Sequence, residues 1–437
     1  MAAPCTSITD DRLAVLLEEI FLRLPTPADL VHASAACVPF RQIATGNSFL
    51  RRFRKEHSPS FIGFMDWHGF RPTLPPHTTA PIASAVARAA DFTFSFLPSP
   101  TPYTLLPDPG CWCVRSIRDG RVLLDRGHKR DYGSVLFPEL VVCDPLHRRY
   151  HLLPPIPDDL AASVRDALHL TYQRSCEVIL VPPGKEVDKE EYETSFRVIW
   201  MAQCKTKVVA FFYSSTTGQW QSIASKAWSD LLVCGMPIVS LKYRLFYRSH
   251  YAYGCLYWPM TNGIEFGLKN RPGEAMLMLD TMTMEFSVAD YPPGRWRGFQ
   301  VGIVEAGEGR LGLLTFSIND AASQLRYMVR QNTDGSNNEW QLEKIILLGS
   351  GNHSIVASTE RYLLLLRLDF GTDHSEGLSL DVKTFQLERV CELSDVTSRS
   401  IYTSFPPSLS SRTNDAAYLN KYSVYMLKNA IAYIITL

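Results

Sequence analysis

The spacing of apolar residues changes along this chain. Near the N-terminus, five apolar residues have the i, i+3, i+4, i+7, i+11 spacing of one helix face: Leu13, Leu16, Leu17, Ile20 and Leu24. From residue 61 onward this spacing disappears, and short apolar runs alternate with polar turns. The pattern therefore predicts a small helical segment followed by a large body of β-strands.

Capping residues and prolines divide the N-terminal segment into short helices. Thr9 or Asp10 can cap the first helix, and Pro25 ends it. Pro27 suits the first position of a second helix, and Pro39 forces a break or a restart. The inward residues of a last helix, expected over 48–57, are Phe49, Leu50 and Phe53.

These helices are too small to be stable alone, because about forty residues bury too little apolar surface. Several of their apolar residues must therefore rest against something else. Two interpretations stay open from the residues themselves. The helices either cap the β body as a subdomain, or form a docking face for a partner helix.

The β body repeats one unit of apolar runs, a polar turn and a final strand. An acidic or small residue occupies the turn in four of the repeats: Asp144, Ser214–Ser215, Asp280 and Asp381. Five clear units lie over 119–157, 196–223, 254–293, 310–345 and 361–390, and a weaker one lies over 61–97. The period of roughly 50 residues is typical of kelch-like propeller blades. We therefore predict about six blades in preference to a pair of β-sandwiches, which show no blade-scale period.

Charge and cysteine content narrow the class of protein. The 437 residues carry 44 basic and 44 acidic side chains, which gives no reason to expect binding to nucleic acid or to a membrane surface. The ten cysteines show no zinc-knuckle or disulfide spacing, and no signal peptide or membrane-spanning run is present in this sequence. Cys111 and Cys113 are expected to be buried thiols. We expect a cytosolic or nuclear protein.

Few residues suggest catalysis or ligand binding. Gly307–Gly312 spells G-x-G-x-x-G, but the β-leaning run that follows predicts a turn between strands instead of a dinucleotide site. His147 and His151 lie in turn and strand, and the 125–133 segment with His128 reads as an exposed loop. We therefore expect no catalytic residue, no cofactor and no metal.

Recognition in a propeller normally lies on the loops between strands. The candidate loops are 125–135, 184–195, 261–273 and 333–339. Four aromatic residues near turns either anchor a partner there or pack between blades: Trp220, Tyr257, Trp258 and Trp296.

The N-terminal segment resembles an F-box, most closely that of grass F-box proteins. The match runs over residues 8–57 and includes LLEEIFLRLP, DLVHASAACVPFRQI and SFLRRFRKEH. Two segments of the body, 142–155 and 402–409, resemble the β-rich region that follows the F-box in plant proteins, which makes 58–437 the expected substrate-recognition domain. Phe40 stands where the family often has Trp, and Pro39 where it often has a basic residue.

The resemblance implies a set of residues that bind a Skp-type adaptor. These are Leu16, Ile20, Leu24, Pro25, Leu30, Ser34, Cys37, Phe40 and Ile43. It further implies a non-catalytic receptor subunit of a Skp–cullin–F-box ubiquitin ligase, which bridges the adaptor, and through it a cullin, to an unidentified client protein. The alternatives are a non-degradative F-box scaffold, and a propeller binding module or enzyme with an incidental helical cap.

Overall fold

The structure is a computed structural model. It describes residues 11–24, 29–30, 33–34, 36–44, 49, 52–53, 57, 59–66, 69–98, 112–126, 136–164, 176–184, 194–231, 248–261, 272–294, 296–317, 323–331, 339–368, 375–393 and 400–403. These residues belong to two compact units, a helical unit before Phe61 and a β unit from Phe61 onward. Each unit is described by itself. Among the described helices, none is long and apolar enough to cross a membrane.

The helical unit contains α1 (Asp11–Leu22) and α3 (Val38–Ala44). Pro39 is the second residue of α3, where its missing N–H removes no helical hydrogen bond, so the expected restart is confirmed. Phe49 and Phe53 are buried, as expected. The expected caps and the helix start at Pro27 lie outside the described residues, as does Leu50.

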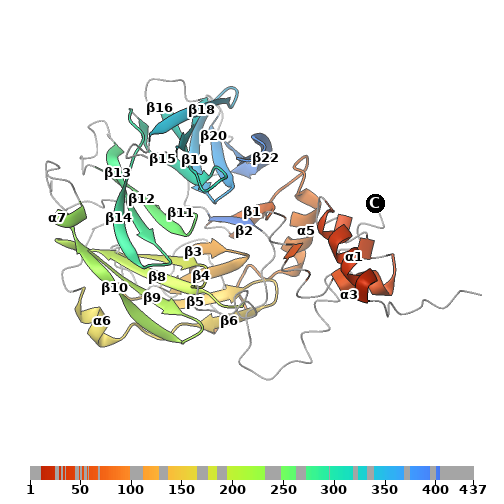
Figure 1. The fold of residues 1–437 in the computed structure, drawn as a ribbon, viewed down its shortest axis with the longest axis horizontal. Coiled ribbons are helices and arrows are strands. Elements are labelled where there is room, and N and C mark those ends of the chain that lie inside the picture. The colour runs from red at the N-terminus through yellow and green to blue at the C-terminus, as the bar shows by residue number, and fades with distance from the viewer. Residues whose placement is uncertain are drawn as a thin grey trace, which may run out of the picture. The chain divides into compact units, whose positions relative to one another are not determined.

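The β unit is a six-bladed β-propeller, which confirms the expected architecture (Figure 1). Blades 2 to 6 are four-stranded antiparallel sheets in chain order, and blade 1 has three strands. Blade 1 contains β23 (Ser400–Thr403), β1 (Phe61–Asp66) and β2 (Gly69–Pro72), from the inside outward. Blade 2 contains β3 (Trp112–Arg118), β4 (Arg121–Arg126), β5 (Glu139–Asp144) and β6 (Arg149–Leu152). Blade 3 contains β7 (Cys176–Val181), β8 (Arg197–Gln203), β9 (Lys207–Ser214) and β10 (Gln219–Ala227).

The remaining blades follow the same plan. Blade 4 contains β11 (His250–Ala252), β12 (Cys255–Thr261), β13 (Pro272–Asp280) and β14 (Glu285–Asp290). Blade 5 contains β15 (Trp296–Glu305), β16 (Leu311–Ser317), β17 (Gln324–Arg330) and β18 (Trp340–Leu347). Blade 6 contains β19 (Asn352–Ser358), β20 (Tyr362–Leu368), β21 (Ser375–Asp381) and β22 (Gln386–Leu393). Two short helices, α6 (Asp158–Ala162) and α7 (Trp228–Leu231), lie in connections.

Blade 1 joins the two ends of the propeller. β23 pairs antiparallel with β1, with Phe64 opposite Ile401 and Met65 opposite Ser400. The helix α5 (Ala80–Ala89) packs against β1 and β2 in this blade, which has no fourth strand among the described residues. The expectation that 92–97 (FTFSFL) belongs to a β unit was wrong. That segment forms turns, and Phe92, Phe94 and Leu97 pack into the core between blades 1 and 2.

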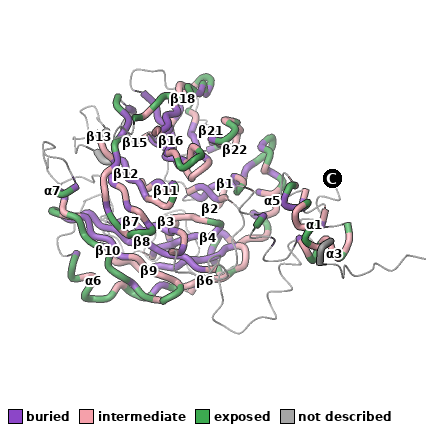
Figure 2. The backbone as a smooth tube through the Cα atoms, viewed as in Figure 1, coloured by how far each residue is buried: buried purple, intermediate pink, exposed green. Residues whose placement is uncertain are grey.

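Among the described residues of the propeller, the buried apolar side chains form six clusters, each between two neighbouring blades. Figure 2 shows buried backbone along the strands of the blades. In the cluster between blades 6 and 1, for example, Phe61 and Phe64 pack with Leu364 and Leu366. Strands in the middle of a blade are buried on both faces, which explains why β8 and β16 are apolar over almost their whole length.

One turn recurs between the third and fourth strands of four blades. Asp144, Asp280 and Asp381 each accept backbone N–H bonds from the residues that follow, with Asp280 Oδ1 2.7 Å from the Met282 nitrogen. Four residues after each acid the backbone is left-handed, at φ values of 54°, 57° and 57°, and Gly218 has φ 70° in blade 3. The equivalence predicted from the acidic residues is therefore confirmed.

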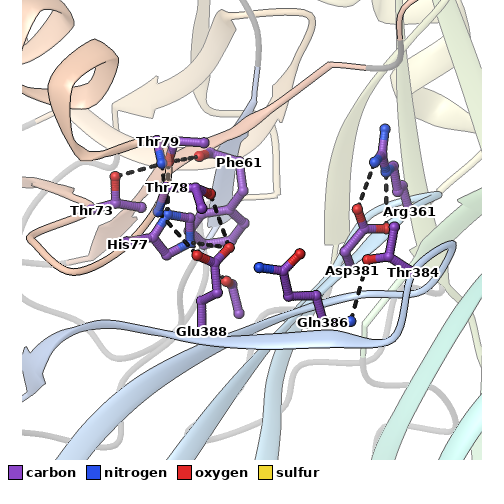
Figure 3. A network of polar contacts seen from close by, with 11 residues as sticks. Phe61, Thr73, His77, Thr78, Thr79, Arg361, Asp381, Thr384, Gln386 and Glu388 are labelled. Carbon is purple, nitrogen blue, oxygen red and sulfur yellow. Dashed lines mark hydrogen bonds and ion pairs between the residues drawn. The ribbon is translucent and has the colours of Figure 1, made fainter. Parts of the chain in front are cut away.

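The seam between blades 6 and 1 carries a polar network (Figure 3). His77 Nε2 lies 2.9 Å from Ser379 Oγ and 3.8 Å from Glu388 Oε2. Thr78 donates its backbone N–H and its hydroxyl to the Glu388 carboxylate, at 3.0 and 3.1 Å. The Thr79 N–H donates to His77 Nδ1 at 3.1 Å, so Nδ1 carries no proton. The network therefore joins the loop after β2 to the last blade.

We predict that Asp280→Ala lowers the free energy of unfolding by roughly 1–2 kcal/mol, because two backbone N–H groups lose a charged acceptor. Chemical denaturation would measure the change. Asp290→Ala removes an exposed carboxylate from the same blade and should cost much less. Equal losses for the two variants would contradict the role of the turn.

We predict that His77 makes the propeller less stable in mild acid. Burial lowers the pKa of His77, although Glu388 acts in the opposite direction. The unfolded chain then binds more protons below its ordinary value of about 6.5, so this part of the stability is present above that pH and is lost as the pH falls below it. In urea unfolding at a series of pH values, His77→Gln should flatten the dependence. Thr78→Val should lower stability at every pH and leave the slope unchanged.

Candidate functional site

The helix α1 has an inward side and an outward side. Phe21 and Leu22 are buried in the core of the helical unit, where the Phe21 ring meets Phe40 edge-on at 5.2 Å between centroids. Leu16 and Ile20, one turn apart, are 57% and 49% exposed. Of the expected apolar stripe, Leu24 packs against this core, whereas Leu16 and Ile20 are exposed.

The structure places the nine predicted adaptor-binding residues in three groups. Leu16 and Ile20 are exposed, and Leu30 and Ser34 are buried. The half-buried members are Leu24, Cys37, Phe40 and Ile43, of which three pack against the core of the helical unit. Pro25 lies outside the described residues. Two further apolar side chains, Val15 at 59% and Val38 at 60% exposure, were not predicted.

The C-terminal part of the helical unit is attached to α1 by polar contacts. Arg52 pairs with Glu18 at 3.2 Å and also with Glu19. The His57 ring nitrogen Nε2 lies 2.7 Å from the Leu22 carbonyl, and its ring stacks on Phe53 at 4.0 Å. These contacts hold α1 in place without using Leu16 or Ile20.

In the propeller, the inner strands end near one another around Arg118. The Arg118 side chain pairs with Glu360 of blade 6, and its guanidinium lies 3.8 Å from the centroid of the Tyr251 ring of blade 4. Burial alone would lower the pKa of Arg118, but Glu360, Asp119 and Tyr251 outweigh it and raise that pKa. One arginine thus connects blades 2, 4 and 6.

Two further contacts connect blades at the same end. His250 Nδ1 of blade 4 lies 2.7 Å from Ser358 Oγ of blade 6, and burial lowers the pKa of His250 to about 3, so its ring is neutral. The Tyr253 N–H donates to Glu305 Oε1 of blade 5 at 2.9 Å. Burial and the nearby Glu360 raise the pKa of Glu305, although the Tyr253 N–H lowers it. These contacts thus connect blade 4 to blades 5 and 6.

Sequence reasoning missed Arg118 and its partners. The Asp119–Gly120 pair, with positive φ at both residues, marks a tight turn directly after Arg118. That signal locates the end of a strand. It does not show that Tyr251 and Glu360, from two other blades, lie opposite.

The four candidate recognition loops do not share one face. The 184–195 and 333–339 loops connect strands one to two and three to four of their blades, whereas 125–135 and 261–273 connect strands two to three. Because neighbouring strands are antiparallel, these two kinds of loop lie at opposite ends of a blade. Most of their residues lie outside the described part of the chain.

The aromatic residues considered as partner anchors pack between blades. Trp220, Tyr257, Trp258 and Trp296 are all less than 9% exposed. Trp220 donates its indole N–H to the Pro154 carbonyl at 2.8 Å, and Trp258 donates to Glu177 at 2.6 Å. The packing alternative is therefore confirmed.

The other candidate motifs are turn and strand residues. Gly307, Glu308 and Gly309 have positive φ in the turn between β15 and β16, as expected. His147 pairs with Asp144 at 2.6 Å, and His151 lies 2.6 Å from the Tyr213 hydroxyl. Cys113 is half-buried in β3, while Cys111 and His128 lie outside the described residues. Within the described ranges, no group of three potential metal ligands comes together.

Comparisons with known proteins return remote structures only. No protein-family model matches the chain, and no curated protein matches it significantly. Among solved structures, TolB from Acinetobacter baumannii aligns at 9% identity and a TM-score of 0.32, over 63% of this chain and 54% of that one. The propeller domain of the Trilobed protease from Pyrococcus furiosus aligns at 7% and 0.34, over 65% and 71%. Acylaminoacyl peptidase from Pyrococcus horikoshii aligns at 6% and 0.34, over 64% and 39%.

The chain thus spans about half of the TolB chain and two fifths of the peptidase chain. Because all three TM-scores are below 0.5, the fold assignment rests on the six sheets of this chain.

We predict that Arg118→Met lowers the free energy of unfolding by about 2–4 kcal/mol, because it leaves Glu360 without its charged partner and removes the contact with Tyr251. Arg310→Met is the control at the same end, because the 30%-exposed Arg310 pairs at 3.5 Å with the 84%-exposed Glu308, and a pair with one fully accessible partner contributes less than about 1 kcal/mol. Denaturant titration of both variants measures the difference. Similar losses would show that the Glu360 and Tyr251 contacts of Arg118 stabilise the propeller no more than the Arg310–Glu308 pair does.

Proposed function

We propose that this protein is a non-catalytic substrate receptor of a Skp–cullin–F-box ubiquitin ligase. The helical unit would bind the Skp-type adaptor, and the propeller would bind the client protein. The observation that carries the proposal is the exposure of Leu16 and Ile20 on a helix whose other side already has a core. The resemblance of residues 8–57 to an F-box supports a Skp-type adaptor as the partner.

Energetics support an interface on α1. About half of the Leu16 and Ile20 side chains is exposed, one turn apart on the helix. Full burial of such a side chain is worth roughly 1.5–3 kcal/mol, so covering the exposed half of each against a partner is worth roughly 1 kcal/mol. The internal contacts of Phe21, Leu22 and Arg52 fix the helix, so this surface is presented without rearrangement. A preorganised apolar face of this kind suits a partner helix.

The propeller supports the client-binding part of the proposal. Its turns between strands one and two and between three and four expose Tyr253 and Met282, at 37% and 38%. Paired side chains hold the backbone behind this face. Recognition residues on loops held by a rigid scaffold are the usual arrangement in propellers.

In the proposed mechanism, this chain brings the client close to the ubiquitin-transferring enzyme and performs no covalent chemistry itself. A receptor that holds a client near a ubiquitin-charged enzyme raises the effective concentration of client lysines. The alternative of a non-degradative scaffold uses the same two surfaces and differs only in the fate of the client.

We predict that Leu16→Ala/Ile20→Ala weakens binding to a Skp-type adaptor by about thirtyfold or more, the effect of losing roughly 2 kcal/mol at an interface. Titration of the full chain with purified adaptor measures the affinity. Neither side chain belongs to the buried core of the helical unit, so thermal unfolding should change little. Leu24→Ala would be a poorer test, because Leu24 packs against the core of the helical unit.

The matched control is Leu74→Ala/Met282→Ala, which truncates two exposed apolar side chains of the propeller. It should leave adaptor affinity unchanged. A folded wild-type chain that does not bind the adaptor would overturn the proposal and leave the helices as a cap.

A further inference from the structure

The outer strand of blade 5 has an unusual surface. β18 is the last strand of its sheet, and among the described residues no strand pairs with its outer edge. Three of its large apolar side chains are exposed, namely Leu342 at 45%, Ile345 at 43% and Leu347 at 72%. An eight-residue edge with this composition is a template for pairing with another strand.

A β-bulge places these three side chains on one face. Lys344 lies opposite Tyr327 and Leu342 lies opposite Met328, so Glu343 is an extra residue without a partner on β17. Ile345 and Leu347 lie opposite Arg326 and Gln324, which share a face with Met328. In a strand without the bulge, Leu342 would point to the other face.

The outer strand of blade 3 is built differently. In β10, Trp220 and Ile223 are buried, and the exposed side chains are Gln219, Gln221, Ser222, Ala224, Ser225 and Lys226. Its exposed positions therefore carry polar or small residues, as is usual for a protected edge. The three exposed aliphatic side chains distinguish β18 from this strand.

We propose that β18 pairs antiparallel with β18 of a second copy of this chain, about a two-fold axis between Glu343 and Lys344. This register places Glu343 opposite the partner's Lys344, Leu342 opposite the partner's Ile345, and Trp340 opposite the partner's Leu347. Opposite charges and apolar pairs are the stabilising cross-strand combinations. A two-fold contact between identical strands forms each combination twice.

The faces of the strand agree with this register. Trp340, Leu342, Ile345 and Leu347 lie opposite even-numbered residues of β17, whereas Gln341, Lys344 and Ile346 lie opposite odd-numbered ones. The pattern is symmetric about the Glu343–Lys344 midpoint, so the opposed side chains that have a partner on β17 fall on the same face of the joined sheet. A regular strand could not satisfy this register, because residues an odd number of positions apart point to opposite faces. Self-complementarity of charge and of face therefore favours a second copy over an unrelated strand.

The contact is small, since each copy contributes one strand. Interfaces at the low end of the size range are weak and reversible, so dissociation in the micromolar range is expected. The proposal is independent of adaptor binding, which uses residues of the helical unit.

The test uses the proposed pairing of Glu343 with the partner's Lys344. Sedimentation of the full chain between about 1 and about 200 μM should show a concentration-dependent dimer. Glu343→Lys and Lys344→Glu each place like charges opposite one another, and each variant alone should dimerise at least tenfold more weakly. An equimolar mixture of the two should restore the dimer, because each lysine pair then faces a glutamate pair. The Glu343→Lys/Lys344→Glu double variant should also dimerise.

The controls separate this contact from other association. Ser222→Lys changes the charge of the protected β10 edge and should not alter dimerisation. A dimer that persists in both single variants would overturn the proposal, because association would then use another surface. A wild-type chain that stays monomeric across the range would overturn it as well. Thermal unfolding of each variant reports any effect of losing the Lys344 contact with the Phe385 ring, 4.0 Å away.

Discussion

The pairing of β1 with β23 is the constraint on which the propeller depends. The two strands come from opposite ends of the unit, and their ladder closes a ring in which each apolar cluster is shared by two blades. No blade has an apolar core of its own, so a blade without a neighbour exposes a face rich in Leu, Val and Phe. Closure removes two such faces at once, which is a larger apolar gain than any single strand pairing supplies.

Polar contacts between blades act differently from the apolar clusters. They gather at the seam, where His77 and Glu388 join the first blade to the last, and at one end of the inner strands, where Arg118 connects three blades. Apolar burial tolerates small shifts of one blade against the next, whereas a directional hydrogen bond does not. We infer that these contacts set the register of the ring, while the clusters supply most of the stability.

The sequence predicted features that repeat locally. Alternating apolar runs and the turn acids at 144, 280 and 381 were enough to predict blades 2 to 6, because both depend on residues near in sequence, whereas the weaker unit over 61–97 supplies only β1 and β2 of blade 1. The sequence could not predict that β23 pairs with β1, since β23 lies more than three hundred residues away and no sequence pattern links the two strands. On α1 the 3.6-residue spacing found an apolar stripe but not its direction. Phe21 and Leu22, outside that stripe, form the core, and the bulge at Glu343 needed the β17 register.

Exposed apolar residues have different physical meanings in the two units. On α1, Leu16 and Ile20 lie in the middle of a helix, where backbone groups bond within the helix, so only side-chain burial can drive association there. On β18, unpaired backbone groups accompany the side chains, so a partner strand adds hydrogen bonds and fixes a register. The first surface suits a partner helix, and the second suits a strand. Under the proposed function, two chains joined through β18 would offer a multimeric client two propellers at once, and binding would strengthen without any new contact to the client.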